Sequence, residues 1–230
     1  MSIINLLAKK ISNYDNPYSI GSRFRTKRAI ALLHLIEKNY HDHGSVNIAD
    51  IGGTEKYWNI IPDDFLEKNY VNITLVNLPG SVFVQNNPRF NYIEADGCDL
   101  KQFADKSFHI AHSNSVIEHV GNWNRMVSFA REISRIAFSY FVQTPNFWFP
   151  IEPHFMVPFF HWMPKPIQIT LVMNFDLGQG KKALSVKEAA RTVASIRLLK
   201  ENEFCELFQD ALIEPEFLFC LKKSFVAIKE

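Results

Sequence analysis

Two histidines in the second half of the chain are the side chains best suited to proton transfer. His119 lies in the segment His112–Val120, and His154 follows Glu152 by two residues. An imidazole ionises near neutral pH, so it can take a proton from a hydroxyl group. We therefore predict His119, His154 and Glu152 as catalytic residues. The alternative is structural: His119 would pack or cap at a helix start, and His154 would be fixed among prolines.

A glycine turn after a buried run is the first candidate binding element. Residues 46–51 have the pattern of a buried strand, and Gly52 and Gly53 follow directly. Glycine allows a sharp turn and lets a ligand approach the main chain, and a helix start beyond it offers free N–H groups. Two glycines after a strand are also an ordinary turn, so this pattern needs support from elsewhere in the chain.

Polar side chains follow the next two predicted strands. Asn77 lies near the end of the strand 72–78, about two dozen residues after the glycines, which is near the spacing at which nucleotide-binding folds place a ribose contact. Asp96 follows the strand 90–95 and could accept a hydrogen bond from the exocyclic amine of adenine. Each residue also fits an ordinary turn, Asp96 as an Asx turn.

The predicted strands alternate with helical segments. Further strands are expected over residues 107–112 and 136–142, the second ended by Thr144 and Pro145, with a helix over residues 122–136. This alternation predicts an α/β fold with a parallel sheet, right-handed crossovers and helices on both faces. Ligands of such sheets bind beyond the carboxyl ends of the strands, where the strand order reverses.

A helix is also predicted near the start of the chain, over residues 22–40, with Ile30, Leu33 and Ile36 on its apolar side. Its first turns carry a basic cluster, formed by Arg23, Arg25, Lys27 and Arg28. We interpret this cluster as a solvated helix face. A role in holding an anionic substrate or a lid is the alternative.

The last part of the chain predicts a helix and then a hairpin. The helix covers residues 185–210, where Ser185 fits the N-cap position and Glu188 completes a capping box. Two strands follow over residues 214–221 and 224–228, joined by a tight Lys-Lys turn, so the final pair is antiparallel.

Composition bounds the class of protein. The 230 residues suit one domain, 47% of them are hydrophobic, and the formal net charge of +1 gives no field that would attract nucleic acid. The three cysteines, Cys98, Cys205 and Cys220, lack metal-ligand spacing, and the N-terminal residues lack the order of a secretory signal. We expect a cytoplasmic monomer or homodimer without nucleic-acid partners and without stable membrane insertion.

Taken together, the four strand ends resemble those of class I S-adenosylmethionine-dependent methyltransferases. In this chain the fourth predicted strand leads into Ser113–Val120, with the sequence SNSVIEHV. This segment is similar to the one that follows the fourth strand in a broad group within that family. The resemblance covers roughly residues 45–145 by motif and extends to the chain end by topology. It implies a Rossmann-like, doubly wound, mostly parallel seven-stranded sheet with a C-terminal antiparallel hairpin and helices on both faces.

The resemblance also implies S-adenosylmethionine as cofactor, with S-adenosylhomocysteine as product, and assigns its contacts. The methionine part would meet the first strand end, the ribose the second, the adenine the third, and the sulfonium the fourth. The predicted cofactor-binding residues are, in that order, Asp50, Gly52, Gly53 and Thr54; Asn77 and Leu78; Asp96, Gly97 and Cys98; and Ser113 and Asn114.

The chain departs from the family pattern at the glycine loop and the ribose contact. Thr54 and Lys56 stand where the later glycines of the loop would lie, and Asn77 replaces the usual carboxylate. Some quinone-pathway O-methyltransferases hold a divalent ion with a Glu-x-x-Glu-His run at this place. Here Ser115 stands at the first glutamate position, before Glu118 and His119, so no metal is predicted.

Within one domain we expect four segments. They are an N-terminal helical segment (1–44), a cofactor-binding core (45–144), an aromatic and proline-rich substrate lid (145–184) and a C-terminal helix and hairpin (185–230). The aromatic side chains of the lid could wall an apolar or ring-shaped acceptor. Alternatively, they pack the lid onto its own sheet.

The predicted function is methyl transfer from S-adenosylmethionine to a small-molecule acceptor. A hydroxyl group is the favoured acceptor group, reached by in-line displacement with a histidine base. An inactive partner protein that only binds the cofactor is the alternative, because of the atypical glycine loop and Asn77. An NAD(P)-dependent oxidoreductase ranks below both, since the chain lacks the Gly-x-Gly-x-x-Gly pattern.

Overall fold

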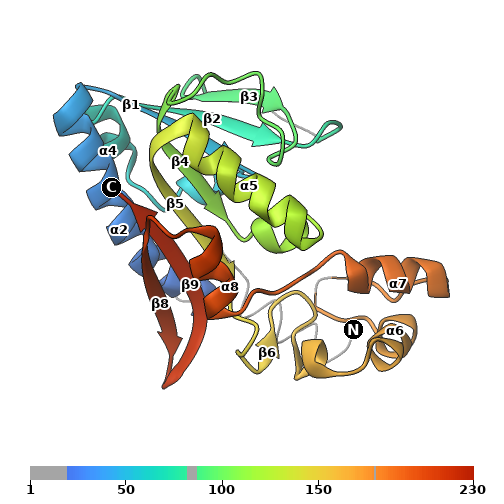
Figure 1. The fold of residues 1–230 in the computed structure, drawn as a ribbon. Coiled ribbons are helices and arrows are strands. Elements are labelled where there is room, and N and C mark those ends of the chain that lie inside the picture. The colour runs from blue at the N-terminus through green and yellow to red at the C-terminus, as the bar shows by residue number, and fades with distance from the viewer. Residues whose placement is uncertain (1–19, 82–86, 179) are drawn as a thin grey trace.

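A seven-stranded sheet forms the centre of the protein (Figure 1). The computed structural model describes residues 20–81, 87–178 and 180–230, and the side chains from residue 26 onward. The strand order is β3-β2-β1-β4-β5-β9-β8, in which the first five strands are parallel and β9 runs antiparallel to both of its neighbours, β5 and β8. This confirms the predicted fold class. The strands are β1 (Val46–Ile51), β2 (Val71–Asn77), β3 (Phe90–Glu94), β4 (Phe108–Asn114), β5 (Ala137–Pro145), β8 (Leu212–Leu218) and β9 (Leu221–Lys229).

Helices cover both faces of the sheet (Figure 1). On one face, α2 (Ile20–His43) packs with α3 (Glu55–Trp58) and α4 (Asp63–Lys68), and their apolar side chains share one buried cluster with β1 and β2. On the other face, α5 (Trp123–Ile136) and α8 (Glu201–Leu207) complete a second cluster. The apolar runs of the strands are thereby buried on both sides, as a parallel sheet requires.

A separate lobe projects from the sheet beyond β5, and it contains α6 and α7 (Figure 1). Its elements are β6 (Ile151–Glu152), β7 (Val157–Pro158), the short helix η2 (Phe160–Trp162), α6 (Lys165–Asn174) and α7 (Val186–Ala194). The lobe has a small apolar cluster of its own, around Phe155, Phe160, Val172 and Val193. The aromatic residues of this segment therefore serve in part to hold the lobe together.

The predicted helix over residues 185–210 is two helices in the structure, so that prediction was wrong in its middle. Residues 195–200 leave the helix, and Leu199 forms a bridge with Asn146 beside the end of β5. Ser185 does cap α7 by accepting from the Glu188 N–H, while the Glu188 carboxylate accepts from the N–H of Leu184. Tertiary pairing at Leu199 overrides the local helical pattern.

The end of β5 and the turn of the final hairpin also differ from the prediction. β5 continues to Pro145 instead of ending before Thr144, because its last residues pair with β9 and the missing N–H of a terminal proline costs no ladder bond. The final hairpin turns at Phe219–Cys220, not at the two lysines. Phe219 adopts φ 55°, and the lysines lie within β9.

The predicted apolar side of the first described helix is confirmed only in part. Ile36 is buried and Leu33 is half-buried, whereas Ile30 is 65% exposed, and Leu32 and Leu35 complete the buried side. Within the basic cluster, Arg28 is buried rather than solvated, and Lys27 is exposed. The side chains of Arg23 and Arg25 lie outside the described part.

Arg28 and Glu216 of β8 form a buried ion pair that ties α2 to the hairpin. The guanidinium donates two hydrogen bonds to the carboxylate, at 3.0 and 2.7 Å. Burial alone would raise the pKa of Glu216, but the charge and hydrogen bonds of Arg28 outweigh it and hold the pKa below its usual value. A carboxyl group with a lowered pKa stabilises the fold above its unfolded-state pKa, near 4.3.

Glu216→Gln is therefore expected to lower the free energy of unfolding at neutral pH by about 3 kcal/mol, because it leaves a buried arginine without a countercharge. As the pH falls below about 4.3, the free energy of unfolding should also decrease less in the variant than in the wild type. Urea unfolding between pH 3 and pH 7, roughly the range over which carboxylates titrate, measures both. Glu230→Gln, at an exposed ion pair with Lys38, is the matched control and should cost under about 1 kcal/mol.

None of the helices in the described part of the chain combines the length and the apolar character needed to cross a bilayer.

Candidate functional site

Four strand ends meet along one edge of the sheet, at the point where the strand order reverses. β1 lies between β2 and β4, and their registers bring Ile51 beside Val76 and Asp50 beside His112. β3 continues the edge, because the N–H of Ala95 donates to the carbonyl of Asn77. In open α/β sheets this edge is where ligands bind.

The glycine loop turns directly after β1. Gly52 adopts φ 74°, a region that other residues seldom adopt, and a Cβ there would lie 2.5 Å from the side chain of Val116. A Cβ at Gly53 would collide with the carboxylate of Asp50 at 1.7 Å. Both glycines are thus required by close packing within the protein, and Gly52 leaves exposed backbone at the strand edge.

Two of the predicted cofactor-binding side chains point into the core instead of toward the edge. The Asp50 carboxylate is fully buried and accepts from Trp58 Nε1 at 2.7 Å, with the Nδ1 of His112 at the same distance. The Ser113 hydroxyl is fully buried and donates to the carbonyl of Ile51. These side chains stabilise the loop from within the protein. Asp50 and Ser113 could therefore contact a ligand only through their backbone atoms.

Asn77 stands at the end of β2 and is half-buried. Its amide nitrogen donates to the carbonyl of Gly53 at 2.9 Å, and this fixes the side chain against the glycine loop. The amide oxygen then faces away from that bond and can accept from a ligand hydroxyl. Leu78 is 59% exposed beside it, and Thr54, at the start of α3, is exposed as well.

Asp96 presents a partly exposed carboxylate after β3. Arg125 donates to both of its oxygens, at 2.9 and 2.6 Å, and the N–H of Cys98 donates to one of them. Burial would raise the pKa of Asp96, but the hydrogen bonds from Arg125 and Cys98 lower it on balance. Asp96 is therefore ionised at neutral pH. Nothing in the sequence pattern pointed to Arg125, which lies in the first turn of α5.

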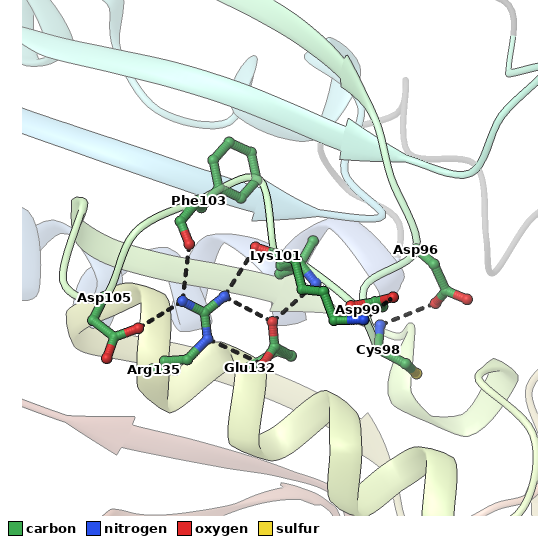
Figure 2. Close-up of polar contacts among 9 residues, drawn as sticks. Asp96, Cys98, Asp99, Lys101, Phe103, Asp105, Glu132 and Arg135 are labelled. Carbon is green, nitrogen blue, oxygen red and sulfur yellow. Dashed lines mark hydrogen bonds and ion pairs between the residues drawn. The ribbon is translucent and has the colours of Figure 1, made fainter.

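The loop that carries Asp96 is anchored on α5, as Figure 2 shows. Arg135 donates to the carbonyls of Leu100 and Phe103 and to the side chains of Asp105 and Glu132. The Glu132 carboxylate in turn accepts from the N–H of Leu100. A Cβ at Gly97 would lie 2.8 Å from Ile51, so this glycine is needed for the loop to pack. The Cys98 thiol is buried, which raises its pKa to about 11.

The end of β4 carries a strained turn. The Asn114 side chain accepts from Arg28, and the next residue, Ser115, adopts φ 56° while its hydroxyl donates to Gln143. A non-glycine residue in this region costs free energy and is common at functional sites. The turn redirects the chain so that Glu118 and His119 follow on a short helix, η1 (Ile117–His119).

The three residues predicted as catalytic come together next to this turn. Nε2 of His119 lies 3.0 Å from Nε2 of His154, and Nδ1 of His154 lies 2.6 Å from the Glu152 carboxylate. Burial and the charge of His154 lower the pKa of His119. Burial also acts to lower the pKa of His154, but the hydrogen bond and charge of Glu152 raise it on balance.

Glu118 is a further member of this group, and the sequence pattern did not single it out as catalytic. Its side chain is fully buried, and burial raises its pKa to about 7. One oxygen accepts from the Thr144 hydroxyl, while the other has no hydrogen-bond partner among the described residues. Donor atoms of Glu118, His119 and His154 lie within 4.8 Å of one another, so these residues could hold a metal ion.

A cavity of about 340 Å³ lies between the lobe and the segment before α8. Glu152 connects it to the histidines, and its walls combine aromatic with charged groups. Its lining includes Phe147, Phe155, Phe160, Lys165, Arg197 and Lys200. Among the other aromatic residues of the predicted lid, Trp148, Phe159 and Trp162 are exposed, and Phe149 is buried.

Comparison with known proteins gives a family match for the central part of the chain. Residues 58–138 match the model of a family described as a methyltransferase domain. This stretch runs from Trp58 through β2, β3, β4 and α5 to the start of β5, so it contains the strand ends that carry Asn77, Asp96 and Asn114. No curated protein matches the chain in sequence.

Solved structures give more distant similarities. A S-adenosylmethionine-dependent methyltransferase from Methanosarcina mazei is 13% identical, with a TM-score of 0.47, over 80% of this chain and 91% of its own. An O-methyltransferase family protein from Burkholderia thailandensis is 9% identical, with a TM-score of 0.48, over 96% of this chain and 62% of its own. These similarities are too remote to assign an acceptor.

Proposed function

We propose that this chain is a class I S-adenosylmethionine-dependent methyltransferase and that it methylates a hydroxyl group of a small-molecule acceptor; the match of residues 58–138 to a methyltransferase domain supports the first part. S-adenosylmethionine is the methyl donor of the family, and S-adenosylhomocysteine is its product. The hydroxyl acceptor and the residues that serve it are the new part of the proposal. The observation that carries them is the His119–His154 pair, which offers a basic nitrogen beside the end of β4.

The groups at the strand edge fit an adenosyl moiety. The amide oxygen of Asn77 suits a ribose hydroxyl, and the ionised carboxylate of Asp96, with 37% of its side chain exposed, suits the amino group of adenine. The exposed backbone of Gly52 allows close approach of the methionine part. These features support cofactor contacts for Gly52, Gly53, Asn77, Asp96 and Asn114, and for the backbone around Asp50 and Ser113.

Bound at this edge, S-adenosylmethionine supplies an already activated methyl group, whose transfer depends mainly on in-line placement. The task of the chain is to align the acceptor oxygen and to remove its proton. As this oxygen forms its bond to the methyl carbon, the carbon–sulfur bond breaks and its electron pair returns to sulfur. The His119–His154 pair receives the hydroxyl proton in the simplest form of this proposal, with Glu152 holding the His154 ring in place.

The acceptor itself would lie against the lobe. The cavity beside Glu152 has aromatic walls for an apolar or ring-shaped molecule and cationic groups, on Lys165 and Lys200, for a polar end. Part of the proposed lid therefore serves the acceptor, while Phe155 and Phe160 also belong to the core of the lobe. We further propose a reducing, cytoplasmic setting, since Cys98, Cys205 and Cys220 are all free thiols.

Donor consumption with matched acceptors tests this function. The protein is incubated with methyl-labelled S-adenosylmethionine and a panel of small alcohols and phenols, each paired with the amine of the same skeleton. We expect label in one or more hydroxyl compounds, with one S-adenosylhomocysteine formed per methyl transferred. Transfer to amines alone would contradict the hydroxyl assignment. Tight binding of the donor without turnover on any acceptor would favour an inactive, cofactor-binding protein.

A further inference from the structure

Two imidazole nitrogens face each other at the end of β4. Nε2 of His119 lies 3.0 Å from Nε2 of His154, with the ring planes 89° apart. Because Nδ1 of His154 donates to Glu152, the neutral His154 ring turns the lone pair of Nε2 toward His119. An electropositive atom must therefore lie between the nitrogens, either a proton or a metal ion. When two imidazole nitrogens bind one ion at about 2.1 Å each and the nitrogen–metal–nitrogen angle is near 90°, the two nitrogens lie about 3 Å apart.

Glu118 adds a carboxylate oxygen that the protein leaves unsatisfied. The side chain is fully buried, its Oε2 accepts from Thr144, and its Oε1 has no hydrogen-bond partner among the described residues. Burying a carboxylate oxygen without a partner is costly, so such an atom calls for a positively charged or donating group. The donor atoms of Glu118, His119 and His154 lie within 4.8 Å of one another, close enough for one small ion to approach all three.

We propose that Glu118, His119 and His154 bind a divalent transition-metal ion. Two imidazoles and one carboxylate suit Zn²⁺, Mn²⁺, Fe²⁺ or Co²⁺, whereas Mg²⁺ and Ca²⁺ prefer sites made of oxygen ligands. Glu152 acts as the positioning residue, since its carboxylate accepts from the far nitrogen of His154 and fixes the ring, an arrangement that recurs at metal-binding histidines.

The surroundings of the three residues suit a catalytic rather than a purely structural ion. Three protein ligands leave coordination positions open for water or a substrate. His119 is exposed and His154 is partly exposed, so both can be reached from solvent, while Glu118 lies below them in the core. An ion with an open position would lower the pKa of an acceptor hydroxyl that reaches it, in place of direct proton uptake by His119. Only this role rests on the proposed function; ion binding does not.

Metal titration of the full chain tests the site. After removal of metals with a chelator, Zn²⁺ and Co²⁺ are titrated by calorimetry, and the visible absorption of Co²⁺ reports its ligand environment. We expect one ion per chain for either metal and no comparable response to Mg²⁺. His154→Ala should weaken binding at least 100-fold, and Glu152→Gln about 10- to 100-fold, because only the orientation of the ring is lost. His41→Ala, at an exposed histidine far from the site in sequence, is the control and should bind as the wild type does.

Absence of one-to-one binding would overturn the inference, as would unchanged affinity in both His119→Ala and His154→Ala. S-adenosylhomocysteine binding, measured on the same samples, reports whether each variant is folded and keeps the two proposals apart. A chain that binds S-adenosylhomocysteine but no metal contradicts only the metal site. A chain that binds the metal but not S-adenosylhomocysteine supports the metal site and contradicts the proposed function.

Discussion

Asp96→Ala is expected to remove most of the thermal stabilisation that S-adenosylhomocysteine gives the protein. The substitution deletes the charged acceptor proposed for the adenine amino group, and a hydrogen bond to a charged group contributes about 1.5–3 kcal/mol, or up to roughly 100-fold in affinity. At a concentration of 100 times the wild-type Kd, the ligand stabilises the wild type by about 2.7 kcal/mol, but a 100-fold weaker variant by only about 0.4 kcal/mol. Thermal unfolding with and without ligand measures this difference.

Asp99→Ala is the matched control for this experiment, because Asp99 lies on the same loop but its carboxylate pairs with the exposed Lys101. It should keep the full ligand-induced shift. Asp96→Ala also frees Arg125 and removes the acceptor for the Cys98 N–H, so its unfolding without ligand must be recorded as well. An undiminished shift in a folded Asp96→Ala variant would show that the adenine does not contact this carboxylate.

His119→Ala should abolish turnover and leave cofactor binding intact. Loss of a positioned proton acceptor lowers kcat by about 100- to 10,000-fold, and the loss of a metal ligand would remove the same step. His119 follows β4 but does not belong to the adenosyl-binding edge proposed above, so the affinity for S-adenosylhomocysteine should stay within about 3-fold of the wild type, under about 1 kcal/mol. Single-turnover experiments measure the rate of methyl transfer, and titration of the same sample measures the affinity for S-adenosylhomocysteine.

The exposed His41 supplies a control substitution here too, and His41→Ala should retain full activity. Methyl transfer by His119→Ala at a rate close to that of the wild type would reject this histidine as base and as ligand. A parallel loss of cofactor affinity would place His119 in the cofactor site instead.

Much of the fold followed from the sequence because its buried strands are continuous apolar runs. Val46–Ile51, for instance, was predicted with the bounds that the structure has, since four of its six residues are apolar and only Asn47 is exposed, as suits a strand covered on both faces. The segment 185–210 could not be predicted in the same way. Its break depends on the pairing of Leu199 with Asn146, a contact between residues far apart in the chain.

The site was predictable to the extent that topology alone defines it. A parallel sheet brings the ends of β1, β2, β3 and β4 to one edge, so candidates at these ends could be selected from the sequence. Which way a side chain points could not be deduced: Asp50 turns into the core toward Trp58 and His112. The contact between His119 and His154 likewise depends on how the lobe folds back after β5. Only this contact makes Glu118 part of a group of three possible metal ligands.

The central claim is that the ends of β1 to β4 form the binding site for an adenosyl group. A crystal structure of the protein with S-adenosylhomocysteine tests it most directly. We expect the adenine beside Asp96, the ribose beside Asn77, and the sulfur in front of Asn114, facing His119. A ligand bound at any other place, with this edge of the sheet left to solvent, would contradict the account.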